Sequence, residues 1–222
     1  GVSPFLNQMA MFLVQITLNN TLTYYGALSH YGEDIPLACV GVISKVNILM
    51  LGFTLGISQG CQPIFSYNYG ARQYSRVREA YRKAIVAASV ICCIAFVCFQ
   101  LFPRPIVALF DPSGSEEYFQ FAERYFRIYM FMTLANAFQP ITANFFTSIG
   151  KAKRGALIAL TRQVIFLIPL ILIFPLFLGI DGVMYAGPIA DSAAVVVALA
   201  LVTREMKRMP HVDEPVAADT LV

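Results

Sequence analysis

Six long apolar stretches constrain the fold of this chain more than any other feature. They cover roughly residues 4–25, 36–62, 80–102, 118–150, 155–178 and 182–203. An α-helix needs about 20 apolar residues to cross the hydrocarbon core of a bilayer. Because lipid offers no partner for an open backbone N–H or C=O, a helix is the expected form of each stretch. The sequence therefore predicts an all-α membrane protein with six transmembrane helices.

Composition agrees with this class. Hydrophobic residues make up 58% of the chain, charged residues make up 13%, and the mean hydropathy is +0.65. Soluble domains carry about 25% charged residues. The net charge of +3 is spread over short loops, which argues against a nucleic-acid partner. We expect residues 1–209 to form one transmembrane domain and residues 210–222 to form a mobile cytoplasmic tail.

The basic residues predict the orientation of the chain. Eleven of the 16 Lys and Arg residues fall in the connections after the second and fourth spans and at the exit of the sixth: Arg72, Arg76, Arg78, Arg82, Lys83, Lys151, Lys153, Arg154, Arg204, Lys207 and Arg208. The loops on the other side offer only Arg104. Since short cytoplasmic loops carry an excess of Lys and Arg, both ends of the chain are expected on the cytoplasmic side.

Two charged side chains fall deep within predicted spans. Lys45 and Asp191 each lie about nine residues into a span from the outer side, which is roughly 13 Å at 1.5 Å per residue. A charge at this depth is a candidate for ion coupling, or a member of a buried structural pair. The similar depths predict that Lys45 and Asp191 pair with each other, although Lys45 could also extend outward to the interface. Arg162, two turns into the fifth span, is expected to extend to the inner surface in a structural role.

Uncharged polar residues recur on the first and fourth spans. Gln8, Gln15 and Asn19 share one helix face, and so do Asn136 and Gln139. A polar stripe in lipid must face other helices or water. Interhelical hydrogen bonds would explain both stripes, and a water-filled cleft is the alternative. We take Gln8, Gln15, Asn136 and Gln139 as candidates for lining a substrate cleft.

Glycines mark one face of the second span. Gly52, Gly56 and Gly60 recur every four residues and predict close packing against another helix. Pro63 follows, and proline disfavours continued helix, so that we expect the span to end at 62 and a turn at 66–70. No residue pattern indicates a metal site.

Several segments resemble a known family. Residues 56–71 read GISQGCQPIFSYNYGA and resemble the signature after the eighth helix of multidrug and toxic compound extrusion (MATE) transporters. The tenth helix of that family and its exit resemble residues 138–140, FQP, and 148–154, SIGKAKR. The start of its twelfth helix resembles residues 182–191, GVMYAGPIAD. The resemblance spans nearly the whole chain.

The resemblance implies a twelve-helix antiporter with two six-helix lobes around a central cleft. Such a protein exports small organic, often cationic, compounds in exchange for Na⁺ or H⁺ across the bacterial plasma (inner) membrane. This chain is similar to the C-terminal lobe. It is therefore expected to act with an N-terminal six-helix lobe, from the same gene or from a separate chain, and not to transport by itself. No cofactor is expected beyond the coupling ion.

The chain departs from one branch of that family. The NorM-like branch carries a glutamate in the seventh helix and an aspartate in the tenth, where this sequence has Phe12 and Asn136. The sequence is more similar to the DinF-like or MepA-like branches, in which the first lobe is expected to carry the coupling carboxylate. Asp191 is then expected to be the only deeply buried carboxylate of this lobe.

Three other functions are alternatives to the antiporter. A lipid-linked oligosaccharide flippase of the same superfamily would carry more cationic residues in its cavity than Lys45 and Arg162. A membrane-embedded enzyme would need paired carboxylates or a histidine cluster at membrane depth, and the two histidines, His30 and His211, lie in a loop and in the tail. A non-transporting structural membrane subunit remains an alternative. The sequence favours a transporter that is not an enzyme.

Overall fold

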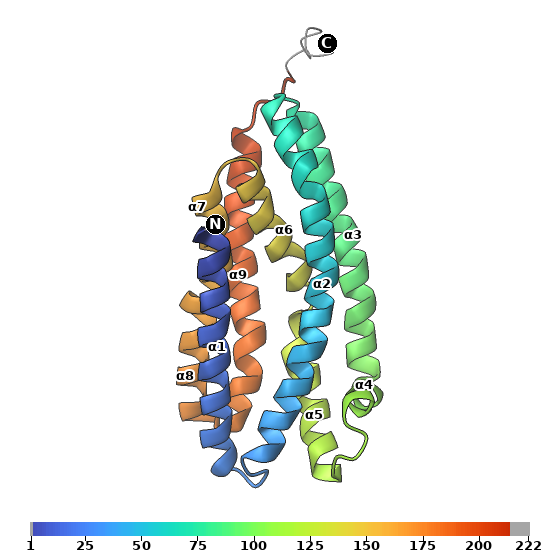
Figure 1. Ribbon diagram of the computed structural model, residues 1–222, viewed down its shortest axis with the longest axis vertical. Helices are drawn as coiled ribbons and strands as arrows, with labels where there is room; N and C mark the ends of the chain where they lie inside the picture. Colours follow the sequence, from blue (N-terminus) through green and yellow to red (C-terminus); the bar gives the residue numbers. More distant parts are fainter. Residues whose placement is uncertain (1, 214–222) are drawn as a thin grey trace.

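The computed structural model describes residues 2–213, with the backbone alone at positions 2–4 and 136. This part of the chain is an elongated bundle of helices without a strand (Figure 1). Its elements are, in order, α1 (Val2–Ala27), α2 (Asp34–Gly70), α3 (Tyr74–Leu101), α4 (Pro103–Phe110), α5 (Glu116–Tyr129), the 3₁₀ turn η1 (Met130–Met132), α6 (Ala135–Ser148), α7 (Ala152–Leu160), the π-helical segment η2 (Thr161–Leu167), α8 (Ile168–Leu178) and α9 (Ile180–Arg208).

The six predicted spans correspond to these elements, and the all-α fold class is confirmed. The first, second, third and sixth spans are α1, α2, α3 and α9, whereas the fourth is α5–η1–α6 and the fifth is α7–η2–α8. Four helices of the described chain are long and apolar enough to cross a membrane by length and composition: α2, α3, the continuous run over 152–178, and α9. The membrane boundaries of the spans stay predictions.

The expected end of the helix at 62 and the expected turn at 66–70 are wrong, because α2 continues through Pro63 to Gly70. Proline removes one helical hydrogen bond, but packing against α6 stabilises the turns that follow. Phe65 is fully buried and meets Phe145 edge-on, with 5.3 Å between ring centroids. Ser66 Oγ donates a hydrogen bond of 3.0 Å to the Ser148 carbonyl. Neighbouring helices commonly make proline tolerable in a membrane helix in this way.

The actual end of α2 is a tight cap. Arg72 has a φ of 57°, the left-handed conformation that usually closes a helix. The Arg72 N–H donates to the Tyr69 carbonyl at 3.1 Å, and the Gln73 N–H donates to the Asn68 carbonyl at 2.9 Å. This pair of bonds is the Schellman arrangement, which satisfies carbonyls left open at a helix terminus.

The fourth and fifth predicted spans are both interrupted. The fourth is too long for one straight crossing, and the chain breaks it at η1 between α5 and α6. The fifth contains the π-helical turn η2, which ends two residues before Pro169. Proline cannot donate to the preceding turn, so that the regular α-helical bonding is not available there.

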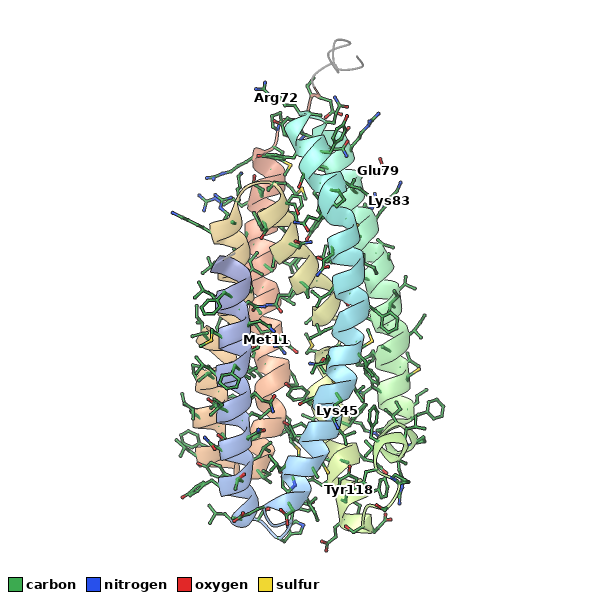
Figure 2. The ribbon with its side chains drawn as sticks, viewed as in Figure 1. Met11, Lys45, Arg72, Glu79, Lys83 and Tyr118 are labelled. Atoms are coloured by element: carbon green, nitrogen blue, oxygen red, sulfur yellow. The ribbon has the colours of Figure 1, made fainter. Side chains whose placement is uncertain are left out.

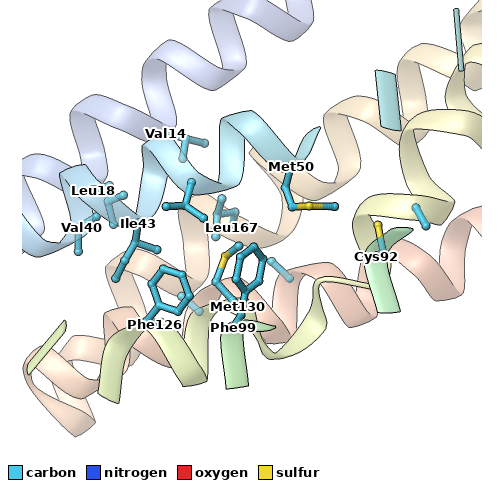
Figure 3. Packing of buried hydrophobic residues seen from close by; sticks show 14 of the residues in the cluster. Val14, Leu18, Val40, Ile43, Met50, Cys92, Phe99, Phe126, Met130 and Leu167 are labelled. Atoms are coloured by element: carbon cyan, nitrogen blue, oxygen red, sulfur yellow. The ribbon is translucent and has the colours of Figure 1, made fainter. Parts of the chain in front are cut away.

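The core runs along the whole bundle. Figure 3 shows Val14 and Leu18 of α1 packed near Ile43 of α2, with Phe126 and Leu167 on the opposite side. Many large apolar side chains also remain exposed on the outside of the bundle, on α1, α2, α3 and α8 in particular. An apolar exterior around a packed core is the surface that a lipid-embedded bundle requires.

The first residues of the predicted tail are attached to α3. Arg78 Nη2 donates to the carbonyls of Met209 and Pro210, at 2.8 Å each. The Ser75 N–H donates to Asp213 Oδ1 at 2.9 Å. Residues 210–213 thus contact α3, the mobility of the tail stays a prediction, and residues 214–222 lie outside the described part of the chain.

Candidate functional site

The most deeply buried ion pair joins Arg162 of η2 to Asp191 of α9. The Arg162 Nε donates directly to Asp191 Oδ1, and the two side chains are only 11% and 8% exposed. Burial of two charges is tolerated only where each compensates the other, because the desolvation of a lone ion costs several kcal/mol. The pair therefore connects the fifth and sixth spans inside the bundle.

Local sequence explains why these two side chains meet. Arg162 lies in the π-helical turn, and such turns re-aim side chains relative to a regular helix. On α9, Gly187 lies one turn before Asp191, and a Cβ at that position would come within 2.5 Å of the Tyr129 ring. Only glycine lets Tyr129 pack this closely against α9. The Tyr129 ring in turn stacks on Tyr125, with centroids 5.5 Å apart.

The predicted pair of Lys45 with Asp191 is wrong. Lys45 is exposed on α2, and among the described residues it has no ion-pair partner (Figure 2). Helix α9 packs instead against α8, η2, α6 and α5. A similar depth along two helices does not fix the direction in which their side chains point, and the depths themselves stay predictions. Arg162 likewise extends into the bundle rather than to the inner surface.

A second buried carboxylate was missed. Glu205 of α9 is almost fully buried, and its two oxygens pair with Lys151 Nζ and Arg154 Nη1. The expectation that Asp191 is the only deeply buried carboxylate is therefore wrong. The available signal was a single acidic residue among basic ones at the exit of the sixth span, close to the basic connection after the fourth span.

The polar face of α6 makes interhelical hydrogen bonds. Gln139 Nε2 donates to the Ile158 carbonyl of α7 at 3.2 Å. Asn144 Nδ2 donates to the Ser58 carbonyl of α2 at 2.7 Å. For Gln139 the structure thus shows the interhelical alternative, and its role in a cleft stays a prediction. Asn136 lies in α6, and its side chain is outside the described part of the chain.

The polar stripe of α1 is uncovered. Gln8, Gln15 and Asn19 are exposed, and Gln15 Nε2 donates to Asn19 Oδ1 at 3.0 Å along the helix. Within the described residues, no hydrogen bond joins Gln8 or Gln15 to Gln139. The stripe is free to face water, a ligand or another protein segment.

The glycine face of α2 is also uncovered. No described atom lies within 4 Å of a Cβ built on Gly52, Gly56 or Gly60, apart from their own helix and chain neighbours. The close approach of another helix of this chain, which the glycine spacing predicted, is therefore absent from the described bundle. Packing of this face against a segment outside the chain stays a prediction.

A comparison with protein families identifies this bundle. The family model MatE matches residues 8–173. The chain belongs to the MatE family. This confirms the resemblance to MATE transporters, and the match includes residues 56–71, 138–140 and 148–154.

Individual relatives agree with the assignment. The MatE chain is 23% identical over 204 residues to "Multidrug export protein MepA" of Staphylococcus aureus strain MSSA476 and to that of Staphylococcus haemolyticus strain JCSC1435. Each match covers 91% of this chain and 42% of the relative. The chain thus spans less than half the length of these relatives.

Solved structures show the same fold. A MATE crystal structure in the straight conformation matches with a TM-score of 0.84 and 19% identity, over 94% of this chain and 45% of that one. An outward-facing multidrug resistance MATE family transporter of the MOP superfamily matches with a TM-score of 0.84 and 20% identity, over 94% and 46%. The MatE chain therefore has the fold of one half of a MATE-type transporter.

Proposed function

We propose that this MatE chain forms the C-terminal half of a multidrug efflux antiporter that exports small organic, often cationic, compounds. The observation that carries the proposal is the family match together with relatives named multidrug export proteins, which align over 91% of the chain. The family is a class of transporters, and an enzymatic role has no support in the site. The N-terminal six-helix lobe is the proposed partner.

The location that we propose is the bacterial plasma membrane, with both ends of this segment in the cytoplasm. The α2–α3 connection, the α6–α7 connection and the end of α9 all lie at one end of the bundle, at the top of Figure 1. These three places, together with the first three turns of α3 and the first turn of α7, carry eleven of the 16 basic residues. This geometry supports the proposed orientation, because the basic clusters share one side and short cytoplasmic loops carry the excess of Lys and Arg.

The uncovered stripe of α1 is the best-supported part of the substrate cleft. Gln8 and Gln15 are exposed, and their amides can donate to and accept from a bound compound. Gln139 already bonds to the Ile158 carbonyl, which leaves less of its hydrogen-bonding capacity for a substrate. We therefore place Gln8 and Gln15 ahead of Gln139 and Asn136 as cleft residues.

We further propose that Na⁺ or H⁺ coupling depends on the N-terminal lobe. In this half, Asp191 is already paired with Arg162 and Glu205 with two cations. A carboxylate with a compensating cation is poorly suited to hold a second one. Asp191 remains the candidate of this half if coupling occurs here, and Lys45, being exposed, has no carboxylate partner to couple with among the described residues.

The function is tested in vesicles that contain the two-lobe protein. An imposed Na⁺ or proton gradient should drive accumulation of a fluorescent cationic drug, and Gln8→Leu/Gln15→Leu should slow it while expression stays normal. Asn20→Leu is the matched control, since Asn20 is exposed on another face of α1. Failure of both gradients to drive drug movement in the wild-type protein would contradict the proposal. Equal loss in the control would contradict the assignment of the cleft face.

A further inference from the structure

A groove of about 500 Å³ runs between α2 and α3, away from the polar stripe of α1. Ile57, Cys61 and Ile64 line it from α2, and Ala84 and Ala87 line it from α3. These positions recur at helical spacing, so that each helix presents one stripe to the groove. The small side chains of α3 leave the space that larger ones would fill.

The groove is apolar at one end and charged at the other. Because α2 and α3 are antiparallel neighbours, Asn68 lies near Arg76 at the end of the bundle, and Ile57 lies near Ala87 towards its middle. The twelve residues from Ile57 to Asn68 are eleven steps of 1.5 Å apart from end to end, which is about 16 Å. That is close to half of the roughly 30 Å hydrocarbon core, which is the depth of one leaflet.

The charged end carries a net positive charge. Arg76, Glu79 and Lys83 line the groove, and Lys83 Nζ pairs with Glu79 Oε1 at 2.7 Å. Figure 2 shows Glu79 and Lys83 on the outer side of α3, near the top of the bundle. Arg76 lies in the first turn of α3, where the helix dipole also favours an anion. An anionic group bound at this end would face two cations, Arg76 and Lys83, and one carboxylate, Glu79, which is a net charge of +1.

We propose that the groove binds an anionic glycerophospholipid from the leaflet at that end of the bundle. Its phosphate lies between Arg76 and Lys83, and one acyl chain lies along Ile64, Cys61 and Ile57. The two halves of the groove match the two halves of such a lipid in charge and in length. A free anion leaves the apolar half unused, and an organic cation meets like charges at the rim. The proposal does not depend on which compound the protein transports.

The test measures lipid retained by the full-length protein. The protein is extracted with an equal mixture of phosphatidylglycerol and phosphatidylcholine, and bound lipids are counted by native mass spectrometry. Wild type should retain phosphatidylglycerol preferentially, and Arg76→Gln/Lys83→Gln should lower that preference about tenfold. Glu79→Gln should raise it, because it removes the one acidic group of the rim. Ala87→Phe should lower retention of the lipid without changing any charge.

The matched control removes two cations from the same end but outside the groove. Arg82→Gln/Lys153→Gln changes the net charge equally, and both residues are exposed and absent from the groove lining. Unchanged preference in this control supports the groove. An equal fall would overturn it, because the protein would then attract anionic lipid only through its overall charge. Unchanged retention of phosphatidylglycerol in Ala87→Phe would also overturn the proposal, and so would displacement of the lipid by millimolar inorganic phosphate. Thermal unfolding of each variant confirms that it is folded.

Discussion

Asp191 and Glu205 are both buried carboxylates of α9, and they are stabilised in different ways. Asp191 has one guanidinium partner, and both side chains of that pair are about a tenth exposed. Glu205 has two partners, Lys151 and Arg154, each of which is about a third exposed. The two residues are fourteen positions apart, which is about 21 Å of helix. All of their partners lie on the α6–α7 connection, α7 or η2, so that two ion clusters join the fifth span to the sixth.

The two sites differ in what happens to the cationic partners when the carboxylate is removed. At the Glu205 cluster, the released cations can turn to water at the end of the bundle. At Asp191, the released guanidinium stays in the interior. The free energy of unfolding should therefore depend more strongly on Asp191 than on Glu205, although Glu205 has more partners.

The largest effect is expected for Asp191→Asn. It leaves Arg162 buried without a compensating charge and should lower the free energy of unfolding by about 3–5 kcal/mol. Thermal or denaturant unfolding in detergent measures the loss. The double variant Arg162→Met/Asp191→Leu should recover most of it, since a buried pair can be replaced by apolar residues. Strictly additive effects of changes at the two positions would show that the side chains do not interact.

Glu205→Gln should have a smaller effect, about 1–3 kcal/mol in the same assay. The amide keeps a hydrogen-bond acceptor for one cation, and Lys151 and Arg154 are exposed enough to be hydrated. Lys151→Gln alone should cost less still, because Arg154 remains paired with the carboxylate. A larger loss for Glu205→Gln than for Asp191→Asn would reverse the comparison.

Lys45→Met extends the comparison to a charged residue outside both ion clusters. Lys45 is exposed and has no ion-pair partner among the described residues, so that the free energy of unfolding should change by less than about 0.5 kcal/mol. Its effect should add to that of Asp191→Asn. If Lys45→Met instead recovered part of the stability lost in Asp191→Asn, that result would support the Lys45–Asp191 pair predicted from the sequence.

The smallest effect is expected at Asp213, whose carboxylate attaches the tail to α3. The Ser75 hydroxyl and N–H both donate to Asp213, and these bonds lower the pKa of the carboxyl below its ordinary value. The pKa of Asp213 is lower in the attached state than its ordinary value of about 4. The contact is therefore fully present above that ordinary pKa, and it is lost as the pH falls through the lowered pKa. A fluorescent probe near residue 212 should report release of the tail in acid, and Ser75→Ala should release it at higher pH. An unchanged release pH in Ser75→Ala would contradict this contact.

The sequence predicted the fold better than the contacts within it. Apolar length predicted six spans, because the bilayer imposes the same requirement on every crossing. Helical elements occupy all six stretches, and four helices of the described residues are long and apolar enough to cross a membrane by length and composition. Pro63 misled the prediction of the end of α2, since the burial of Phe65 against α6 outweighs one missing hydrogen bond. Glycine spacing identified a smooth face on α2 but could not say what covers it.

For charged residues too, the sequence predicted burial better than it predicted the contacts. Asp191 stood out because it is alone in an apolar run, and the structure confirms that it is buried. Its partner could not be predicted from depth, because the π-helical turn sets the direction of Arg162. Glu205 was overlooked because basic neighbours made it look like part of a solvated end. Partners of buried charges depend on helix rotation, which hydropathy does not encode.

The most direct test of the account is drug transport by Arg162→Met/Asp191→Leu in the two-lobe protein. This variant removes the buried pair without leaving an unpaired charge in the interior. If the pair is structural and the N-terminal lobe carries ion coupling, vesicles with the variant should still accumulate drug in response to a Na⁺ or proton gradient, at a rate close to wild type. A folded variant that has lost gradient-driven accumulation would contradict the account and place ion coupling at Asp191.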